Sequence, residues 1–207
     1  MKNMLKDAGI LLLITLFSGL ILGLVYQITK EPIALAEEKA AKEAYAEVFK
    51  DAADFEELEK KEGTGTDADS DWIQAGYENV EIEKVLLAKA ADGSSLGYVL
   101  TVTSHEGYGG DITFTMGLQN DGALNGISLL AISETAGLGM KAEAVLKPQF
   151  ENKKAANFTY TKTGSTMDSQ IDAISGATIT TNAVTTAVNG GLFYFQTELG
   201  GGVNEAE

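Results

Sequence analysis

The stretch Asp172-Ala-Ile-Ser-Gly-Ala-Thr178 consists mostly of small and polar residues and leads into an apolar run from Ala183 to Phe195. Ser and Thr favour the starts of helices and Gly relieves tight turns, so the stretch predicts a turn that opens a helix. The first amides of a helix have no partners within it and suit an anion, particularly a phosphate. The stretch therefore fits either an ordinary helix cap or a phosphate site, where a hydroxyl flanked by small residues could carry the phosphate covalently.

Two Asp-Gly pairs, Asp92-Gly93 and Asp121-Gly122, lie upstream of this stretch, and each separates two runs rich in apolar residues. The runs are residues 80–87 and 97–103 around the first pair, and 112–116 and 124–132 around the second. Asp-Gly between such runs is typical of a β-hairpin turn, so the region predicts an antiparallel sheet of at least four strands.

Two helices are predicted after these hairpins. Residues 142–150 and 182–196 predict helices that cover one face of the sheet. The predicted fold class is α+β, an antiparallel sheet with flanking helices, preceded by one N-terminal transmembrane helix.

The predicted transmembrane helix is the stretch from Ala8 to Thr29, which contains no charged residue. At 1.5 Å per residue it spans about 33 Å, enough to cross the hydrocarbon core of a bilayer. Lys2 and Lys6 precede it and acidic residues begin at Glu31, so the positive-inside rule predicts a cytoplasmic N-terminus and an extracytoplasmic remainder. A cleaved signal peptide is the alternative, because Ala34-Leu-Ala36 resembles a cleavage site, but the apolar run is too long for one. A retained anchor in the cell (inner) membrane is preferred.

Residues 31–61 are rich in Ala, Glu and Lys and predict a helix with one apolar stripe. The stripe consists of Ala41, Tyr45, Val48, Ala52 and Phe55. It either packs on the chain's own domain or docks on another subunit. Residues 62–71 are rich in Gly, Thr, Asp and Ser and predict a loop or linker.

The composition excludes several kinds of site. The chain has no Cys, which excludes thiolate metal sites, iron–sulfur clusters and disulfides, so any redox chemistry requires an organic cofactor. All 15 basic residues are Lys, and the net charge is −15, which together argue against nucleic acid and against a strong guanidinium clamp on phosphate. No nucleophile–base pair, metal cluster or dinucleotide fingerprint is visible, so the pattern indicates an electron carrier rather than a catalyst acting on a substrate.

Three stretches resemble one known family. Residues 172–178 resemble the D-x-x-[S/T]-G-A-T motif of the FMN-binding domain in RnfG and NqrC, which are membrane electron-transfer subunits. Gly107-Tyr-Gly-Gly110 and Ser133-Glu-Thr-Ala-Gly-Leu-Gly139 resemble the same family, with Ala136 where the family usually has Pro. The resemblance covers residues 80–195 and the N-terminal helix.

The resemblance implies that a flavin transferase joins one FMN through its phosphate to the hydroxyl of Thr178. Ser175, Gly176 and Ala177 are small and would leave room for that enzyme. Asp172 either orders the turn or contacts the transferase, and turn formation is the commoner role of Asp in such a loop.

The resemblance also implies that the loop at 133–139 contacts the isoalloxazine ring. The residues concerned are Glu134, Thr135, Gly137, Leu138 and Gly139. Gly in this loop either lets the backbone approach a flat ring or is required only for its dihedral angles. In the stretch 107–110, Tyr108 and Gly109 are also predicted to bind the cofactor. Tyr108 either stacks on the ring or closes the core. His105, the single His, is predicted to be a surface or loop residue.

The function implied is that of a covalently flavinylated electron-transfer subunit of an ion-translocating ferredoxin:NAD⁺ oxidoreductase (Rnf) complex, without turnover of its own. Its partners would be the other Rnf subunits, the membrane and, during maturation, the flavin transferase. The alternatives are an NqrC-like subunit of a Na⁺-translocating NADH:quinone reductase and a cofactor-free, membrane-tethered binding module. The predicted regions are the N-terminus and transmembrane helix (1–30), an acidic helical stalk and linker (31–71) and an extracytoplasmic FMN-binding domain (72–207).

Overall fold

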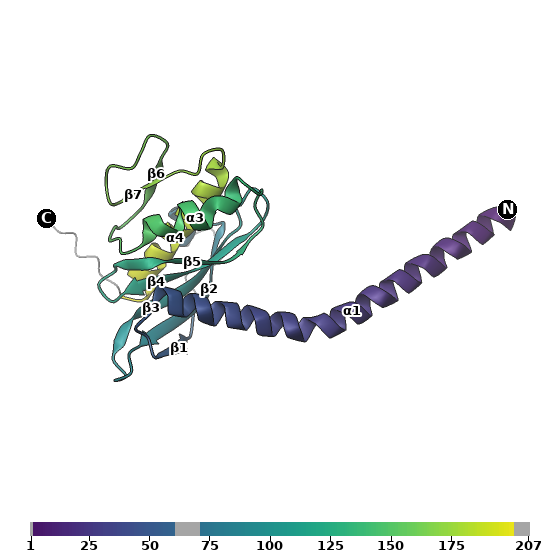
Figure 1. Cartoon of the computed structure of the whole chain (residues 1–207), viewed down its shortest axis with the longest axis horizontal. Helices are drawn as coiled ribbons and strands as arrows, with labels where there is room; N and C mark the ends of the chain where they lie inside the picture. The colour runs from purple at the N-terminus through teal and green to yellow at the C-terminus, as the bar shows by residue number, and fades with distance from the viewer. Residues whose placement is uncertain (1, 61–70, 201–207) are drawn as a thin grey trace. The chain divides into compact units, whose positions relative to one another are not determined.

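The structure, a computed structural model, describes residues 2–60 and 71–200 (Figure 1). Apart from Asp71, the predicted linker at 62–71 lies outside the described residues. The chain forms two compact units, Met1–Lys42 and Glu43–Glu207.

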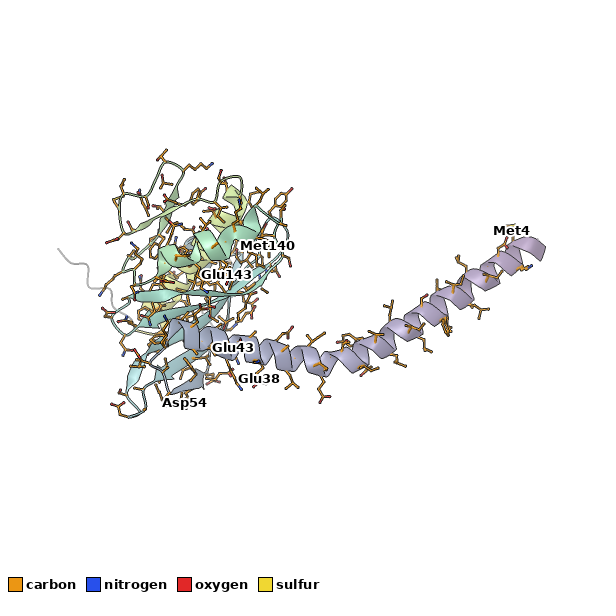
Figure 2. The ribbon with its side chains drawn as sticks, in the orientation of Figure 1. Met4, Glu38, Glu43, Asp54, Met140 and Glu143 are labelled. Atoms are coloured by element: carbon orange, nitrogen blue, oxygen red, sulfur yellow. The ribbon has the colours of Figure 1, made fainter. Side chains whose placement is uncertain are left out.

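The first unit is helical and belongs to α1 (Lys2–Val48), which is long and apolar enough to cross a membrane. Between Ile10 and Leu35 its large apolar side chains are exposed, and Figure 2 shows Met4 projecting away from the helix. The hydroxyls of Thr15 and Thr29 donate to the carbonyls of Leu11 and Val25 one turn earlier, at 3.1 and 2.9 Å, so neither needs an outside partner. These features fit a membrane-spanning helix.

The second unit contains a five-stranded antiparallel sheet in the order β1-β2-β3-β4-β5. The strands are β1 (Asp54–Leu58), β2 (Val80–Lys89), β3 (Ser95–Ser104), β4 (Ile112–Gln119) and β5 (Leu124–Ile132). Both predicted hairpins are confirmed. Gly93 and Gly122 have φ of +81° and +82° in their turns, which explains why Gly follows Asp at each.

The helix predicted over residues 31–61 was wrong beyond residue 48. α1 ends at Val48, and Phe55, which was assigned to the helical stripe, lies on β1 opposite Ala88 of β2. Pairing with the edge of β2 overrides the helical propensity of this acidic segment. The stripe does pack on its own unit, because Tyr45 and Val48 are buried.

The sheet is covered on both faces within the second unit. α4 (Thr178–Glu198) lies along one face (Figure 1), where the backbone of Gly191 leaves room for the side chain of Met116. The last turn of α1 lies on the other face, where a Cβ on Gly117 would come within 2.9 Å of the Cβ of Val48. The predicted helix 182–196 is therefore confirmed, and it begins four residues earlier.

The predicted helix 142–150 is a series of short helical turns, with Pro148 in the last of them. They are η1 (Gly139–Lys141), α3 (Ala142–Val145) and η2 (Lys147–Phe150). Three short elements were not predicted, namely α2 (Asp71–Gln74) and the parallel strands β6 (Thr159–Thr161) and β7 (Gln170–Asp172).

The sheet register places the two predicted loops side by side. Ile112, at the start of β4, pairs with Ser104 at the end of β3 and with Ile132 at the end of β5. The loop after β3 and the loop after β5 therefore leave the same end of the sheet.

Candidate functional site

A cavity of about 510 Å³ opens where three segments distant in sequence converge. Its lining residues are Tyr108, Glu134, Thr135, Leu138, Gly139, Gly176, Ala177, Thr178, Ile179 and Thr180. The structure thus brings together most of the residues predicted for the site. The three that do not line the cavity are Ser175, Gly137 and Gly109. Ile179 and Thr180 were not singled out from the sequence.

The turn before α4 leaves the Thr178 hydroxyl free. Thr178 is the first residue of α4, and Ala177 holds the N-cap position with no side-chain cap. Within the described residues, the Thr178 hydroxyl makes no hydrogen bond, and the amides of residues 178–180 have no partner. Thr178 is therefore not the ordinary cap residue that the sequence left open.

Thr181, which the sequence analysis did not single out, closes the turn instead. Its Oγ1 accepts a hydrogen bond from the amide of Ile174 at 3.1 Å and donates to the carbonyl of Ala177 at 2.9 Å. Because Thr181 is fully buried, this arrangement fixes the turn from inside and leaves its outer side open.

Gly176 lies where the turn before α4 packs against the loop after β5. Its φ is +78°, which favours glycine, and a Cβ there would lie 3.1 Å from Cδ2 of Leu138. Leu138 is 41% exposed, so one side of this side chain rests on the turn while the other is open.

Asp172, the last residue of β7, binds the loop that precedes this strand, and its described side-chain contacts do not include the turn that opens α4. Its carboxylate accepts a hydrogen bond from the amide of Ser165 at 2.5 Å. Its own backbone is held by Gln149, whose Oε1 accepts from the Asp172 amide at 2.6 Å. Gln149 was not singled out from the sequence, because nothing in its local pattern points across to residue 172.

Gly137 and Gly139, in the segment after β5, are required for different reasons. A Cβ on Gly139 would lie within 2.7 Å of Glu134 and 2.6 Å from Oγ1 of Thr180, so close packing excludes any side chain there. Gly137 has φ of +78°, and a Cβ at this position would have no other atom within 4 Å. At Gly137, therefore, the backbone conformation alone favours glycine.

We expect Gly137→Val to lower the free energy of unfolding by about 1–3 kcal/mol, because a branched residue is strained at that φ. Gly137→Asn is the matched control and should cost less, since Asn tolerates the left-handed region. Chemical denaturation of the two variants measures the difference. A Gly137→Val protein as stable as the unmodified chain would show that the loop does not require this conformation.

The loop after β3 presents Tyr108 to the cavity. The Tyr108 side chain is 70% exposed, so the alternative that it closes the core was wrong. A Cβ on Gly109 would lie 2.0 Å from the carbonyl oxygen of Ser133, which shows how closely the two loops approach. His105 lies at the surface, where its hydrogen bond to Asp111 (3.0 Å) raises the pKa of the imidazole above its ordinary value.

The cavity has the features that FMN requires. Its volume lies within the range typical of small-molecule sites. Tyr108, Leu138 and Ile179 offer exposed apolar surface for a planar ring, and the three free amides at the start of α4 suit a phosphate. No lysine lines the cavity, and the described residues contain no group of His, Asp and Glu able to hold a metal ion.

Two family models match this chain. The FMN-binding domain model matches residues 107–192, which include all three segments around the cavity, and the RnfG N-terminal region model matches residues 1–48. The chain is 32% identical over 198 residues to the G subunit of the Na⁺-translocating ferredoxin:NAD⁺ oxidoreductase complex of Acetobacterium woodii, covering 94% of this chain and 93% of the relative. The chain belongs to the RnfG family.

Other RnfG proteins also match along most of their length. The G subunit of the proton-translocating ferredoxin:NAD⁺ oxidoreductase complex of Clostridium ljungdahlii is 31% identical over 192 residues, covering 92% of this chain and 91% of the relative. The G subunit of the ion-translocating oxidoreductase complex of Methanosarcina acetivorans is 29% identical over 201 residues, covering 96% and 98%. A weaker likeness is to the crystal structure of Shewanella oneidensis NqrC, at 17% identity and a TM-score of 0.46, covering 72% of this chain and 70% of that one.

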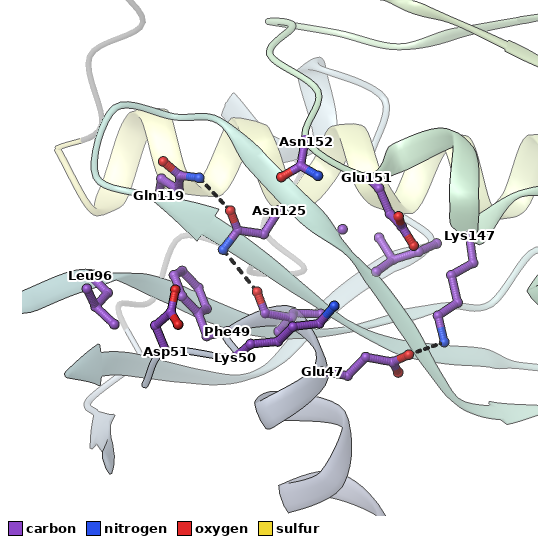
Figure 3. A pocket seen from close by; sticks show the side chains of 13 residues that line it. Glu47, Phe49, Lys50, Asp51, Leu96, Gln119, Asn125, Lys147, Glu151 and Asn152 are labelled. Atoms are coloured by element: carbon purple, nitrogen blue, oxygen red, sulfur yellow. Dashed lines mark hydrogen bonds and ion pairs between the residues drawn. The ribbon is translucent and has the colours of Figure 1, made fainter. Parts of the chain in front are cut away.

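A second cavity, of about 440 Å³, lies at the opposite end of β4 and β5 (Figure 3). Here Asn125 Nδ2 donates to the carbonyl of Val48 at 2.9 Å, and Lys147 pairs with Glu47 at 2.6 Å. Partial burial opposes ionisation of Glu47, but hydrogen bonds from Lys147 and Ser128 hold its pKa below the ordinary value. The stabilisation from this ionised carboxylate is therefore present near neutral pH and is lost as the pH falls through the lowered pKa.

Proposed function

We propose that this RnfG protein is the covalently flavinylated electron-transfer subunit of an ion-translocating ferredoxin:NAD⁺ oxidoreductase complex, with one FMN linked through its phosphate to Oγ1 of Thr178. The observation that carries the proposal is the free hydroxyl of Thr178 at the first position of α4, beside three unpartnered amides and an apolar cavity. The match to the FMN-binding domain and the names of the relatives support it.

The residues around Thr178 can hold a phosphodiester without a basic side chain. The start of a helix carries roughly half a positive charge, and the amides of Ile179 and Thr180 would donate to the phosphate oxygens. Neither Lys nor Arg lines the cavity, so a covalent bond supplies the retention that an ion pair would otherwise provide. When bound, FMN supplies the electron-transfer chemistry, which this Cys-free chain otherwise lacks.

The other parts of the cavity would position the ring. Leu138 and Ile179 lie on segments that meet at the cavity, and their exposed apolar surface would exclude water from one face of the isoalloxazine. Ser175 and Gly176 are exposed, which leaves the outer side of the turn accessible to a flavin transferase.

The proposal includes the arrangement of the chain in the cell. Residues 1–30 would form the cytoplasmic N-terminus and membrane span, residues 31–71 the stalk and linker, and the FMN-binding domain would lie outside the cytoplasm. The other Rnf subunits would donate and accept the electrons, so turnover would belong to the complex and not to this chain alone. The names of the relatives favour this assignment over an NqrC role, and the FMN-binding match favours it over a cofactor-free module.

Denaturation tests the proposal. The chain produced together with a flavin transferase should remain yellow after unfolding in detergent and removal of small molecules, whereas the chain produced without the transferase should be colourless. Flavin that separates from the unfolded polypeptide would contradict a covalent link.

A further inference from the structure

The carboxylate of Glu134 is buried between the two loops that border the cavity. Glu134 is 9% exposed, and its Oε1 accepts a hydrogen bond from the backbone amide of Tyr108 at 2.7 Å. A Cβ on Gly107 would lie 3.0 Å from Oε1, and one on Gly139 would lie 2.7 Å from Oε2. The carboxylate therefore occupies space that is available only because both neighbours are glycines.

This placement is energetically unfavourable unless the carboxylate is compensated. A buried carboxylate is costly without a paired cation, and in residues 2–60 and 71–200 no lysine forms an ion pair with Glu134. Within the same residues, the hydrogen bond from the Tyr108 amide compensates the cost of burying the carboxylate. A hydrogen bond to a carboxylate is charge-assisted and therefore stronger than one between neutral groups. An arrangement of this kind fixes the backbone of Tyr108 firmly.

Tyr108 combines this fixed backbone with a free side chain. Its ring lines the cavity and is 70% exposed, whereas its amide is bound to Glu134. The base of the same loop is closed by the contact between His105 and Asp111. An aromatic ring on a fixed backbone loses little conformational entropy on stacking, so the loop is preorganised to cover a planar group.

We propose that Glu134 is a positioning residue that holds Tyr108 at the mouth of the cavity, so that the phenol ring stacks on the isoalloxazine of FMN. This inference rests on the proposed function, because it requires a flavin in the cavity. Glu134 acts through the Tyr108 amide, and Tyr108 makes the contact with the ring.

The first test uses the full chain produced without flavin. Glu134→Ala removes the acceptor, and the exchange of the Tyr108 amide with solvent should accelerate by at least about tenfold, since hydrogen bonds to charged groups are among the stronger ones. Glu134→Gln keeps an oxygen at the same position and should leave the Tyr108 amide largely protected against exchange. Equal protection of this amide in the unmodified chain and in Glu134→Ala would overturn the proposal.

The second test uses the flavinylated chain. A stacked tyrosine quenches flavin fluorescence by donating an electron to the excited ring, so Tyr108→Leu and Glu134→Ala should each raise the fluorescence per attached flavin several-fold. Glu134→Gln should stay close to the unmodified chain, because its amide oxygen still holds Tyr108. Absorbance of the denatured protein gives the amount of attached flavin in every variant.

The outcomes separate this inference from the proposed function. Unchanged fluorescence in Tyr108→Leu, with flavin still attached, would overturn the stacking and leave the attachment at Thr178 intact. Lower thermal stability of Glu134→Ala with unchanged fluorescence of the folded protein would show a purely structural role and would also overturn it. Absence of attached flavin from the unmodified chain would overturn the proposed function and this inference together.

Discussion

Replacing Thr178 with alanine is expected to abolish flavin attachment and leave the FMN-binding domain folded. The hydroxyl that is removed makes no hydrogen bond within the described residues, and Ala177, not Thr178, occupies the N-cap. Alanine is also a better helix former than threonine, so the free energy of unfolding should change by no more than about 0.5 kcal/mol. Flavin fluorescence of the denatured protein in a gel measures attachment, and thermal unfolding measures stability.

The control for this variant is Ser175→Ala. Ser175 is exposed three residues before Thr178 and also makes no hydrogen bond within the described part of the chain. Its loss should leave attachment largely intact, because its hydroxyl is not the one joined to the phosphate. Gel fluorescence that persists in Thr178→Ala, or that disappears equally in both variants, would contradict the assignment.

A reporter that is active only in the cytoplasm should be silent when it is fused to the C-terminus of this chain. Lys2 and Lys6 lie on the N-terminal side of the apolar part of α1, and lysine bias of this kind directs the N-terminus to the cytoplasm. With one membrane span, the FMN-binding domain then lies on the opposite side. The same reporter fused to the N-terminus should be active, so nearly all of the reporter activity should be found in the N-terminal fusion.

Replacing both lysines with glutamate tests whether their positive charge determines the orientation of the chain in the membrane. These substitutions remove the bias without shortening the apolar helix, so a fraction of the chains should reverse and the C-terminal reporter should become active. Strong activity of the C-terminal fusion in the unmodified chain would reverse the proposed orientation.

Much of the fold could be predicted because its strongest patterns are local. Each Asp-Gly pair specifies a hairpin through its own backbone preferences, and the apolar run after Thr178 has the length of a helix. β1 could not be predicted in this way. Its sequence, Asp-Phe-Glu-Glu-Leu, continues the acidic helical composition before it, and it becomes a strand only because the edge of β2 is available for pairing.

The candidate site shows the same difference between features set by local sequence and features set by contacts in the folded chain. The three motifs predicted which loops meet, but not how their side chains are arranged. Whether Glu134 faces a ring or lies between glycines depends on a contact between segments far apart in sequence. Thr178 and Thr181 are both threonines near the start of the helix, and only the geometry of the turn shows that Thr181 closes it. Ile179 does carry a local signal, since it is an apolar residue isolated among threonines at the turn predicted to open the helix.

The attachment of FMN to Thr178 is tested most directly by the mass of the chain and of its peptides after production with a flavin transferase. No lysine follows Lys162, so trypsin releases residues 163–207, which contain Thr178, as one peptide. We expect the intact chain to be heavier by one FMN less one water, and fragmentation of this peptide to place the whole increase on Thr178. An unmodified mass, or an increase that maps to another residue, would contradict it.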